Sequence, residues 1–140
     1  MANIVPDSFK QELFLATHNF STSAGNTFKL ALYTTVTGFS TGTTNYIVTN
    51  ETSGTGYSAS GTTLTNALVT VAQNISFIDF NDATFSSATI SASCALIYNT
   101  TQSSKAVVVL DFGGTKTSTN GDFTIQFPAP NSTSAVLRIS

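Results

Sequence analysis

The sequence predicts an all-β protein, an antiparallel β-sandwich of jelly-roll-like architecture with one short N-terminal helix. Three observations support this class. Seven to nine apolar segments with strand character recur along the 140 residues, separated by polar turn material. Serine and threonine together number 43, and threonine favours strands because its branched Cβ fits a pleated surface. A chain of this length is near the usual size of one domain, so we expect residues 1–140 to form a single one.

Residues 1–26 contain the one helix that the sequence predicts. Ser8 and Gln11 have the spacing of a capping box, which predicts a helix over residues 7–17. This helix is expected to cover one end of the sandwich or to act as an arm that reaches a neighbouring subunit.

The first half of the chain then predicts four strand segments and a long loop. Residues 27–34 alternate between apolar and polar side chains, as in a half-buried strand. Residues 46–48 are expected to form a short strand, and residues 50–61 a long glycine-rich surface loop. Strand character returns over residues 62–72 and again over residues 75–80.

The second half is dominated by three apolar segments. A long strand is expected over residues 84–98, with one face formed by Ile90, Ala92, Cys94, Leu96 and Tyr98. A polar turn follows at 99–104. Residues 105–112 are apolar on both faces, which is typical of a central strand. Gly113-Gly114 is expected to end this strand or to form a bulge.

Two further strands are expected towards the end of the chain. Asn120-Gly121 is a strong hairpin signal, because both residues accept a positive φ. The next strand is expected to point Phe123, Ile125 and Phe127 inward. The last apolar alternation runs through Ala135, Leu137 and Ile139.

The sequence contains little that indicates catalysis, and we expect no enzyme activity and no cofactor. His18 is the only histidine, and no nucleophile-elbow motif accompanies it. Cys94 lies in an apolar strand and is interpreted as a small buried hydrophobic residue. Asp79 and Asp82 are close enough to share a calcium ion, but the segment between them is better explained as a turn.

Charge and hydropathy also exclude several classes of partner. The net charge is −2 and the five basic residues are scattered, so we expect no binding to nucleic acid or to anionic membranes. No run approaches the roughly 18 apolar residues of a membrane span, and no signal peptide is recognisable. Tyr57, in its glycine-rich loop, is the best candidate for an exposed contact with a glycan or a protein.

Three segments together resemble a family of small tailed-bacteriophage virion proteins. They read Ala-Leu-Ile-Tyr-Asn at 95–99, Ala-Val-Val-Val-Leu-Asp-Phe-Gly at 106–113 and Asn-Gly-Asp-Phe-Thr-Ile at 120–125. Segments 5–10 and 53–57 are also similar to that family. The resemblance covers most of the chain, but it consists of scaffold residues and includes no catalytic or binding motif.

The resemblance implies a capsid decoration, or cement, protein with a jelly-roll-like fold. Such a protein is made in the host bacterial cytoplasm, binds the major capsid protein on the outer surface of the virion and stabilises the shell, and a homotrimer would match three-fold positions. Two alternatives remain open: a tail, connector or tail-fibre component, and a glycan-binding module on the virion surface. The residues expected at the contact surface are Phe9, Leu13, Phe14, Phe39 and Tyr57.

Overall fold

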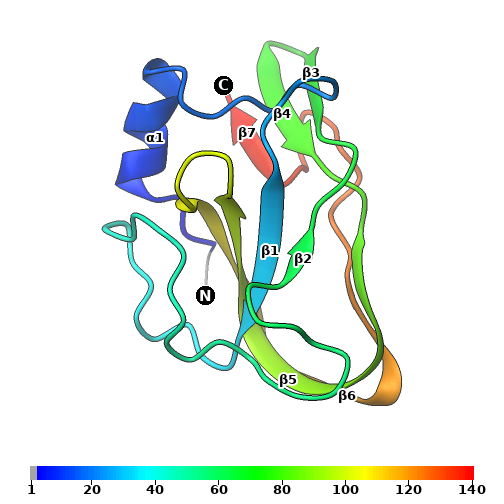
Figure 1. The fold of residues 1–140 in the computed structure, drawn as a ribbon. Coiled ribbons are helices and arrows are strands. Elements are labelled where there is room, and N and C mark those ends of the chain that lie inside the picture. Colours follow the sequence, from blue (N-terminus) through cyan, green and yellow to red (C-terminus); the bar gives the residue numbers. More distant parts are fainter. Residues whose placement is uncertain (1–2) are drawn as a thin grey trace.

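The computed structural model describes residues 3–140, which form two antiparallel sheets and one short N-terminal helix (Figure 1). The first two residues of the predicted segment 1–26 lie outside this description. One sheet has the strand order β2-β1-β5-β6 and the other β3-β4-β7. This sandwich-like arrangement confirms the predicted mostly β class. The elements are α1 (Asp7–Phe14), β1 (Phe28–Tyr33), β2 (Thr62–Thr63), β3 (Leu68–Ala72), β4 (Ile75–Asp79), β5 (Ala83–Asn99), β6 (Lys105–Ile125) and β7 (Leu137–Ile139).

The long hairpin of β5 and β6 dominates the structure. β5 has 17 residues and β6 has 21, and the two strands curve together around the lower part of the molecule (Figure 1). The predicted polar turn joins them, with Ser103 and Ser104 at positive φ (55° and 59°). The pairing changes register at four places, and such irregularities bend a strand and increase its twist.

The predicted hairpin at Asn120-Gly121 is wrong. Asn120 does adopt a positive φ (49°), but it does so inside β6, where Gly121 pairs with Ala88 of β5. Phe123 therefore pairs with Phe85 of β5 and not with the first half of β6. A bulge satisfies the same backbone preference as a hairpin turn, so the local sequence signal did not distinguish them.

The prediction that residues 105–112 form a central strand is also wrong. β6 is an edge strand, and β1 and β5 are the inner strands of its sheet. The first half of β6 is nevertheless buried, because Val108 and Val109 contribute to two different core clusters. Its outer edge is covered by the N-terminal segment, where Ile4 and Val109 exchange both backbone hydrogen bonds (2.9 and 2.8 Å).

Two apolar clusters contact the four-stranded sheet, and β1 contributes to both. Phe28, Leu30 and Leu32 belong to the larger cluster, while Ala31 and Tyr33 belong to the smaller one. Because alternate residues point to opposite faces, β1 is buried on both sides. The expectation of a half-buried strand is therefore wrong.

The predicted single face of β5 is also divided between the clusters. Ile90 and Ala92 belong to the larger cluster, but Cys94, Leu96 and Tyr98 belong to the smaller one. The register between β5 and β6 shifts between Ala92 and Cys94, opposite the bulge that contains Gly113-Gly114. The expectation of one continuous face missed this irregularity, which redirects the side chains.

The predicted short strand at 46–48 is wrong as well. In its place, loop residues between 36 and 47 pack over the smaller cluster. Asn45 forms a single bridge with Lys105, and the Tyr46 ring stacks on Tyr98 with 4.8 Å between centroids. Side-chain packing, not an extended ladder, fixes this segment.

The helix α1 is confirmed, but it ends at Phe14 instead of the predicted residue 17. Ala16 takes a positive φ (56°), which is incompatible with a continuing helix. Ser8 is not the N-cap: Pro6 occupies that position, and the Ser8 hydroxyl donates to the Thr43 carbonyl (3.3 Å).

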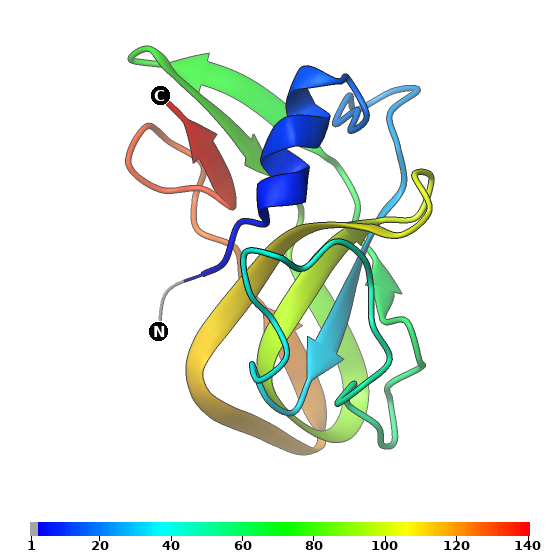
Figure 2. The same ribbon diagram turned by 90° about the vertical axis from the view of Figure 1, so that its left-hand side faces the viewer.

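The three-stranded sheet lies with α1 at one end of the molecule, above the β5–β6 hairpin (Figure 2). Gln73 and Asn74 (φ 52° and 64°) form the two-residue turn between β3 and β4. The strand predicted over 62–72 is divided into β2 and β3, with Asn66 at positive φ (54°) between them. β7 pairs with β4 and confirms the predicted last strand.

Candidate interaction surface

A groove of about 1220 Å³ opens between α1 and the three-stranded sheet. We call it the α1 groove. Its apolar lining includes two residues of α1 and four of the sheet: Leu13, Phe14, Val69, Ile78, Leu137 and Ile139. Its mainly apolar lining and its size make this groove a candidate docking surface.

Strand register explains the apolar floor of the α1 groove. Ile78 of β4 lies between Val69 of β3 and Leu137 of β7, and Ile139 lies opposite Ser76 one step along the ladder. Alternate residues of a strand share a face, so this set forms one surface directed towards α1. The sequence pattern predicted these strands, but it did not reveal that a helix would face them.

The end of α1 projects apolar side chains into solvent. Phe14 is 94% exposed and Leu15 is 68% exposed. Phe9 is buried at 2% and packs 5.0 Å from the His18 ring and 6.3 Å from the Phe20 ring, between centroids. The helix is therefore anchored through Phe9, and its other end is exposed to solvent.

The charged side chains at the α1 groove are cationic. Lys10 pairs with Asp7 outside the groove (2.9 Å), and this contact holds the pKa of Asp7 below its usual range. Arg138 donates to the Ser132 carbonyl (2.8 Å). The lining residues described include no carboxylate, and besides the apolar side chains they comprise these two cations and neutral polar residues, most of them in the segment 18–23.

The structure brings together only part of the predicted contact set. Phe14 is exposed beside the half-buried Leu13, as an interface requires, but Phe9 is too buried for a partner to reach. Phe39 is half-buried and packs edge-on against Tyr33, with 4.8 Å between centroids. Tyr57 lies in the separate loop 50–61. Of the predicted set, Phe9, Leu13 and Phe14 line the α1 groove, together with sheet residues that the sequence analysis did not select, and Phe39 and Tyr57 do not.

Tyr57 does not present its ring and hydroxyl to solvent as expected. Its hydroxyl donates to Glu51 Oε1 (2.7 Å) and accepts from the Leu32 amide (3.0 Å). Its ring lies 5.3 Å from the Phe85 ring. The Tyr57 side chain thus ties loop 50–61 to β1.

Glu51, which sequence reasoning missed, organises this loop. Besides Tyr57, its carboxylate accepts from the Tyr46 hydroxyl (2.5 Å) and the Ser60 amide (2.6 Å). Burial raises the pKa of Tyr46 and of Tyr57, and the hydrogen bonds to Glu51 raise them further. The carboxylate is surrounded by donors from the fold, which explains its position without a ligand.

His18 lies in a buried hydrogen-bond network. Its Nε2 is 2.6 Å from Glu12 Oε2, and its Nδ1 is 3.0 Å from Asn99 Nδ2. The Gln102 amide donates to Asn99 Oδ1 (3.3 Å), so Asn99 directs its amide nitrogen at the ring and Nδ1 must accept. Nε2 then carries the proton and donates to Glu12. The His18 ring therefore joins Glu12 of α1 to Asn99 at the end of β5.

The structure shows no turn at the predicted position; residues 80–82 are an irregular connection from β4 in one sheet to β5 in the other. Asp82 Oδ1 accepts from the Phe127 amide (2.9 Å), and burial raises the pKa of Asp79. Over residues 3–140, no three His, Cys, Asp or Glu side chains converge in a way that would hold a metal ion.

Cys94 is buried, as predicted from its apolar strand. Burial raises the pKa of its thiol to about 12, and the charge of Asp111 contributes to the increase. The thiol therefore stays protonated at neutral pH, and a protonated, inaccessible thiol is a poor nucleophile.

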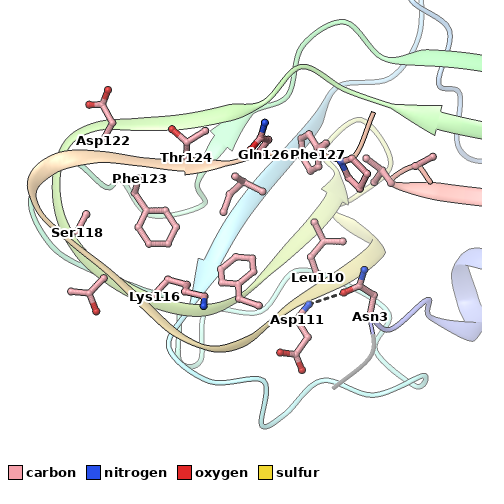
Figure 3. Close-up of a pocket in the computed structure, with 16 residues that line it drawn as sticks. Asn3, Leu110, Asp111, Lys116, Ser118, Asp122, Phe123, Thr124, Gln126 and Phe127 are labelled. Carbon is pink, nitrogen blue, oxygen red and sulfur yellow. Dashed lines mark hydrogen bonds between the residues drawn. The ribbon is translucent and has the colours of Figure 1, made fainter. Parts of the chain in front are cut away.

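A second hollow, of about 510 Å³, lies inside the curve of β6 (Figure 3). Leu110 and Phe123 point into it, while Asp111 and Asp122 point away. The Asp111 amide donates to Asn3 Oδ1 (2.9 Å), and Asp111 Oδ1 accepts from the Gly113 amide (2.8 Å). These contacts support the bend of the strand and leave this hollow a weaker candidate than the α1 groove.

Among the described residues, no helix combines the length and apolar character needed to cross a membrane. Comparison with family models, with curated proteins and with solved structures found no match to this chain.

Proposed function

We propose that this protein is a structural component of a tailed-bacteriophage virion, namely a decoration protein that binds the major capsid protein on the outer shell and stabilises it. One observation carries the proposal: the α1 groove has an apolar lining that includes the exposed Phe14, and the exposed Leu15 follows Phe14 in the chain. This surface needs a protein partner, because exposed aromatic and aliphatic residues are typical anchors of protein interfaces.

The composition supports binding by many weak contacts. Charged residues make up 9% of the chain, so the affinity for a shell would depend little on salt. A shell offers many equivalent positions, and their closed arrangement multiplies the effect of each contact. A fold of two sheets suits such a role, because binding to a shell requires no conformational change.

Three finer elements of the proposal rest on the resemblance of segments 95–99, 106–113 and 120–125 to phage virion proteins. They are a jelly-roll relationship, a location on the capsid surface and a homotrimer at three-fold positions. A tail, connector or tail-fibre component is the alternative that shares this resemblance. Counting copies per virion separates the two, because decoration requires hundreds of copies and a tail component requires few.

Sedimentation with capsids tests the proposal. The purified chain is mixed with expanded capsids that lack it, and separately with free coat subunits. We expect it to pellet with capsids only, and we expect Phe14→Ser with Leu15→Ser to reduce the bound fraction at least tenfold. Val48→Ser is the matched control, because Val48 is 73% exposed but lies away from the α1 groove. A chain that ignores capsids, or that loses binding equally in the control, would exclude this function.

A further inference from the structure

The strand β3 is an edge strand without the usual protection against pairing with another chain. It reads Leu68-Val69-Thr70-Val71-Ala72 and contains no charge, no proline and no bulge. Leu68, Val69 and Val71 are 43%, 50% and 68% exposed. Natural edge strands normally carry lysine, proline or a distortion, because a flat apolar edge adds a foreign strand.

The backbone of β3 is free to accept such a strand. The residues on either side of a two-residue turn form a hydrogen-bonded pair. Ala72 and Ile75, which flank the turn Gln73-Asn74, are therefore such a pair. Hydrogen-bonded and non-hydrogen-bonded pairs alternate along the ladder, so Val71 and Val69 belong to non-hydrogen-bonded pairs. Their N–H and C=O groups therefore point away from β4. The Ile78 carbonyl, opposite Val69, accordingly accepts from Val136 on the other side (3.2 Å). Among the described residues, no backbone bridge reaches the outer edge of β3.

The free edge has defined limits. The Thr22 hydroxyl donates to the Ala67 carbonyl (2.7 Å) and so occupies the position just before β3. The turn Gln73-Asn74 ends the strand on the other side. Five residues, Leu68–Ala72, remain available for pairing.

We infer that the occupant of this edge is β3 of a second copy, paired antiparallel about a two-fold axis at Thr70. The sequence of the strand is nearly the same in both directions, so it is complementary to itself. Val69 of each copy faces Val71 of the other, Leu68 faces Ala72, and the two Thr70 side chains face each other. Apolar pairs and a threonine pair opposite each other are favourable, and no like charges meet.

The direction in which the backbone groups of β3 point agrees with this register. Val69 and Val71 are the residues whose N–H and C=O groups point outward, and they pair with each other across the axis. The two Val69–Val71 pairs give four hydrogen bonds, and Thr70 sits at the non-bonded position between them. Registers centred on Val69 or Val71 also pair outward-pointing backbone groups with each other. In those registers, however, fewer of the five residues of β3 lie opposite a residue of the other copy.

The pairing produces one continuous six-stranded sheet and joins two α1 grooves. A two-fold axis between antiparallel strands is perpendicular to the sheet, so both copies present the same face. The floor of each groove reaches β3 at Val69, and Val69 would face the exposed Val71 of the other copy across the contact. This inference concerns contact between copies and does not depend on capsid binding. It is compatible with a trimer only if pairs of trimers form.

A cysteine at the proposed axis tests the inference without requiring a disruptive change. In a Cys94→Ala background, Thr70→Cys places two thiols at a non-bonded antiparallel pair, where Cα atoms lie about 4.5 Å apart and a disulfide fits. Mild oxidation should give a covalent dimer in high yield at micromolar concentration. Thr124→Cys, an exposed strand position on β6, is the matched control and should stay monomeric in denaturing electrophoresis.

Light scattering after size exclusion supplies the second measurement. The wild-type chain should form even-numbered assemblies, and Val69→Lys with Val71→Lys should halve their mass while keeping the native circular dichroism spectrum. Ile139→Lys, at the opposite edge of the same sheet, should leave the mass unchanged. A wild-type chain that stays monomeric or forms only odd-numbered assemblies would overturn the inference, as would equal cross-linking at residues 70 and 124. Capsid binding by such a chain would leave the proposed function intact.

Discussion

Glu12 and His18 form a buried hydrogen bond of 2.6 Å between Oε2 and Nε2, and this contact fastens α1 to the sheet. Lys105 Nζ approaches the other carboxylate oxygen, Glu12 Oε1, at 3.0 Å. The network therefore links the helix to the first residue of β6. The position of α1, and with it one wall of the α1 groove, depends on these polar contacts as well as on Phe9.

We predict that His18→Ala lowers the free energy of unfolding by about 2–4 kcal/mol, because Glu12 Oε2 and one of the two N–H groups of the Asn99 amide lose their partner in the interior. Chemical denaturation followed by circular dichroism measures the change. Lys10→Ala is the control: it breaks the exposed ion pair with Asp7 and should not move the transition measurably. A His18→Ala variant as stable as the wild type would show that the network does not hold α1.

Alkaline pH should destabilise the fold through its tyrosines. Burial raises the pKa of Tyr33, Tyr46, Tyr57 and Tyr98 above the ordinary value of about 10. The contribution of these protonated hydroxyls to the free energy of unfolding is fully present below pH about 10, the pKa of tyrosine in the unfolded chain. It is lost as pH rises further, because the unfolded chain then releases protons that the folded chain retains.

The measurement for this prediction is a pH titration that follows tyrosinate absorbance and circular dichroism together. Ionisation should coincide with unfolding and not precede it. Tyr57→Phe should remove part of the ionisation amplitude, and it should also lower stability near neutral pH because the Leu32 amide and Glu51 each lose a partner. Ionisation of all four tyrosines in a folded chain would contradict the structure.

A pair of core substitutions tests the assignment of inner and edge strands. Leu96 of β5 is fully buried, and Leu96→Ala should cost about 2–5 kcal/mol. Leu110 of β6 is half-buried beside the second hollow, so Leu110→Ala should cost less, about 1–2 kcal/mol. Equilibrium unfolding of both variants shows which substitution lowers the free energy of unfolding more. A larger decrease for Leu110→Ala than for Leu96→Ala would favour β6 as the central strand.

Gly61 is the glycine whose replacement the fold should tolerate least. Its φ is +77°, and a Cβ there would lie 1.8 Å from the Leu30 carbonyl oxygen. We expect Gly61→Ala to cost at least about 2 kcal/mol in the free energy of unfolding, because it combines backbone strain with a clash against β1. Gly42→Ala meets only a side-chain atom at 3.4 Å and should change stability little. Comparable thermal midpoints for the two variants would contradict this account of loop 50–61.

The sequence predicted local structure well and long-range pairing poorly. Apolar alternation located β1, β4 and β7 to within a few residues, because the period of two is a local property. Asn120-Gly121 was misassigned because a bulge and a hairpin need the same positive φ, and only the partner strand decides between them. The burial of β6 at an edge depends on Ile4, which lies more than a hundred residues away in the chain.

The candidate surface was only partly predictable for the same reason. Phe14 could be selected from the sequence as an apolar residue near the end of a helix. The sheet side of the α1 groove could not, because nothing in the pattern places α1 opposite β7. Tyr57 was misassigned because its neighbours in the sequence are glycines and serines, whereas its hydroxyl reaches Glu51 and β1.

A reconstruction of the virion that carries this protein tests the central claim most directly. The account predicts density for the chain at many symmetric positions on the outer shell, with the α1 groove and the Phe14 side chain against the coat protein. Density at the tail alone, or copies on the shell whose α1 groove faces solvent, would contradict it.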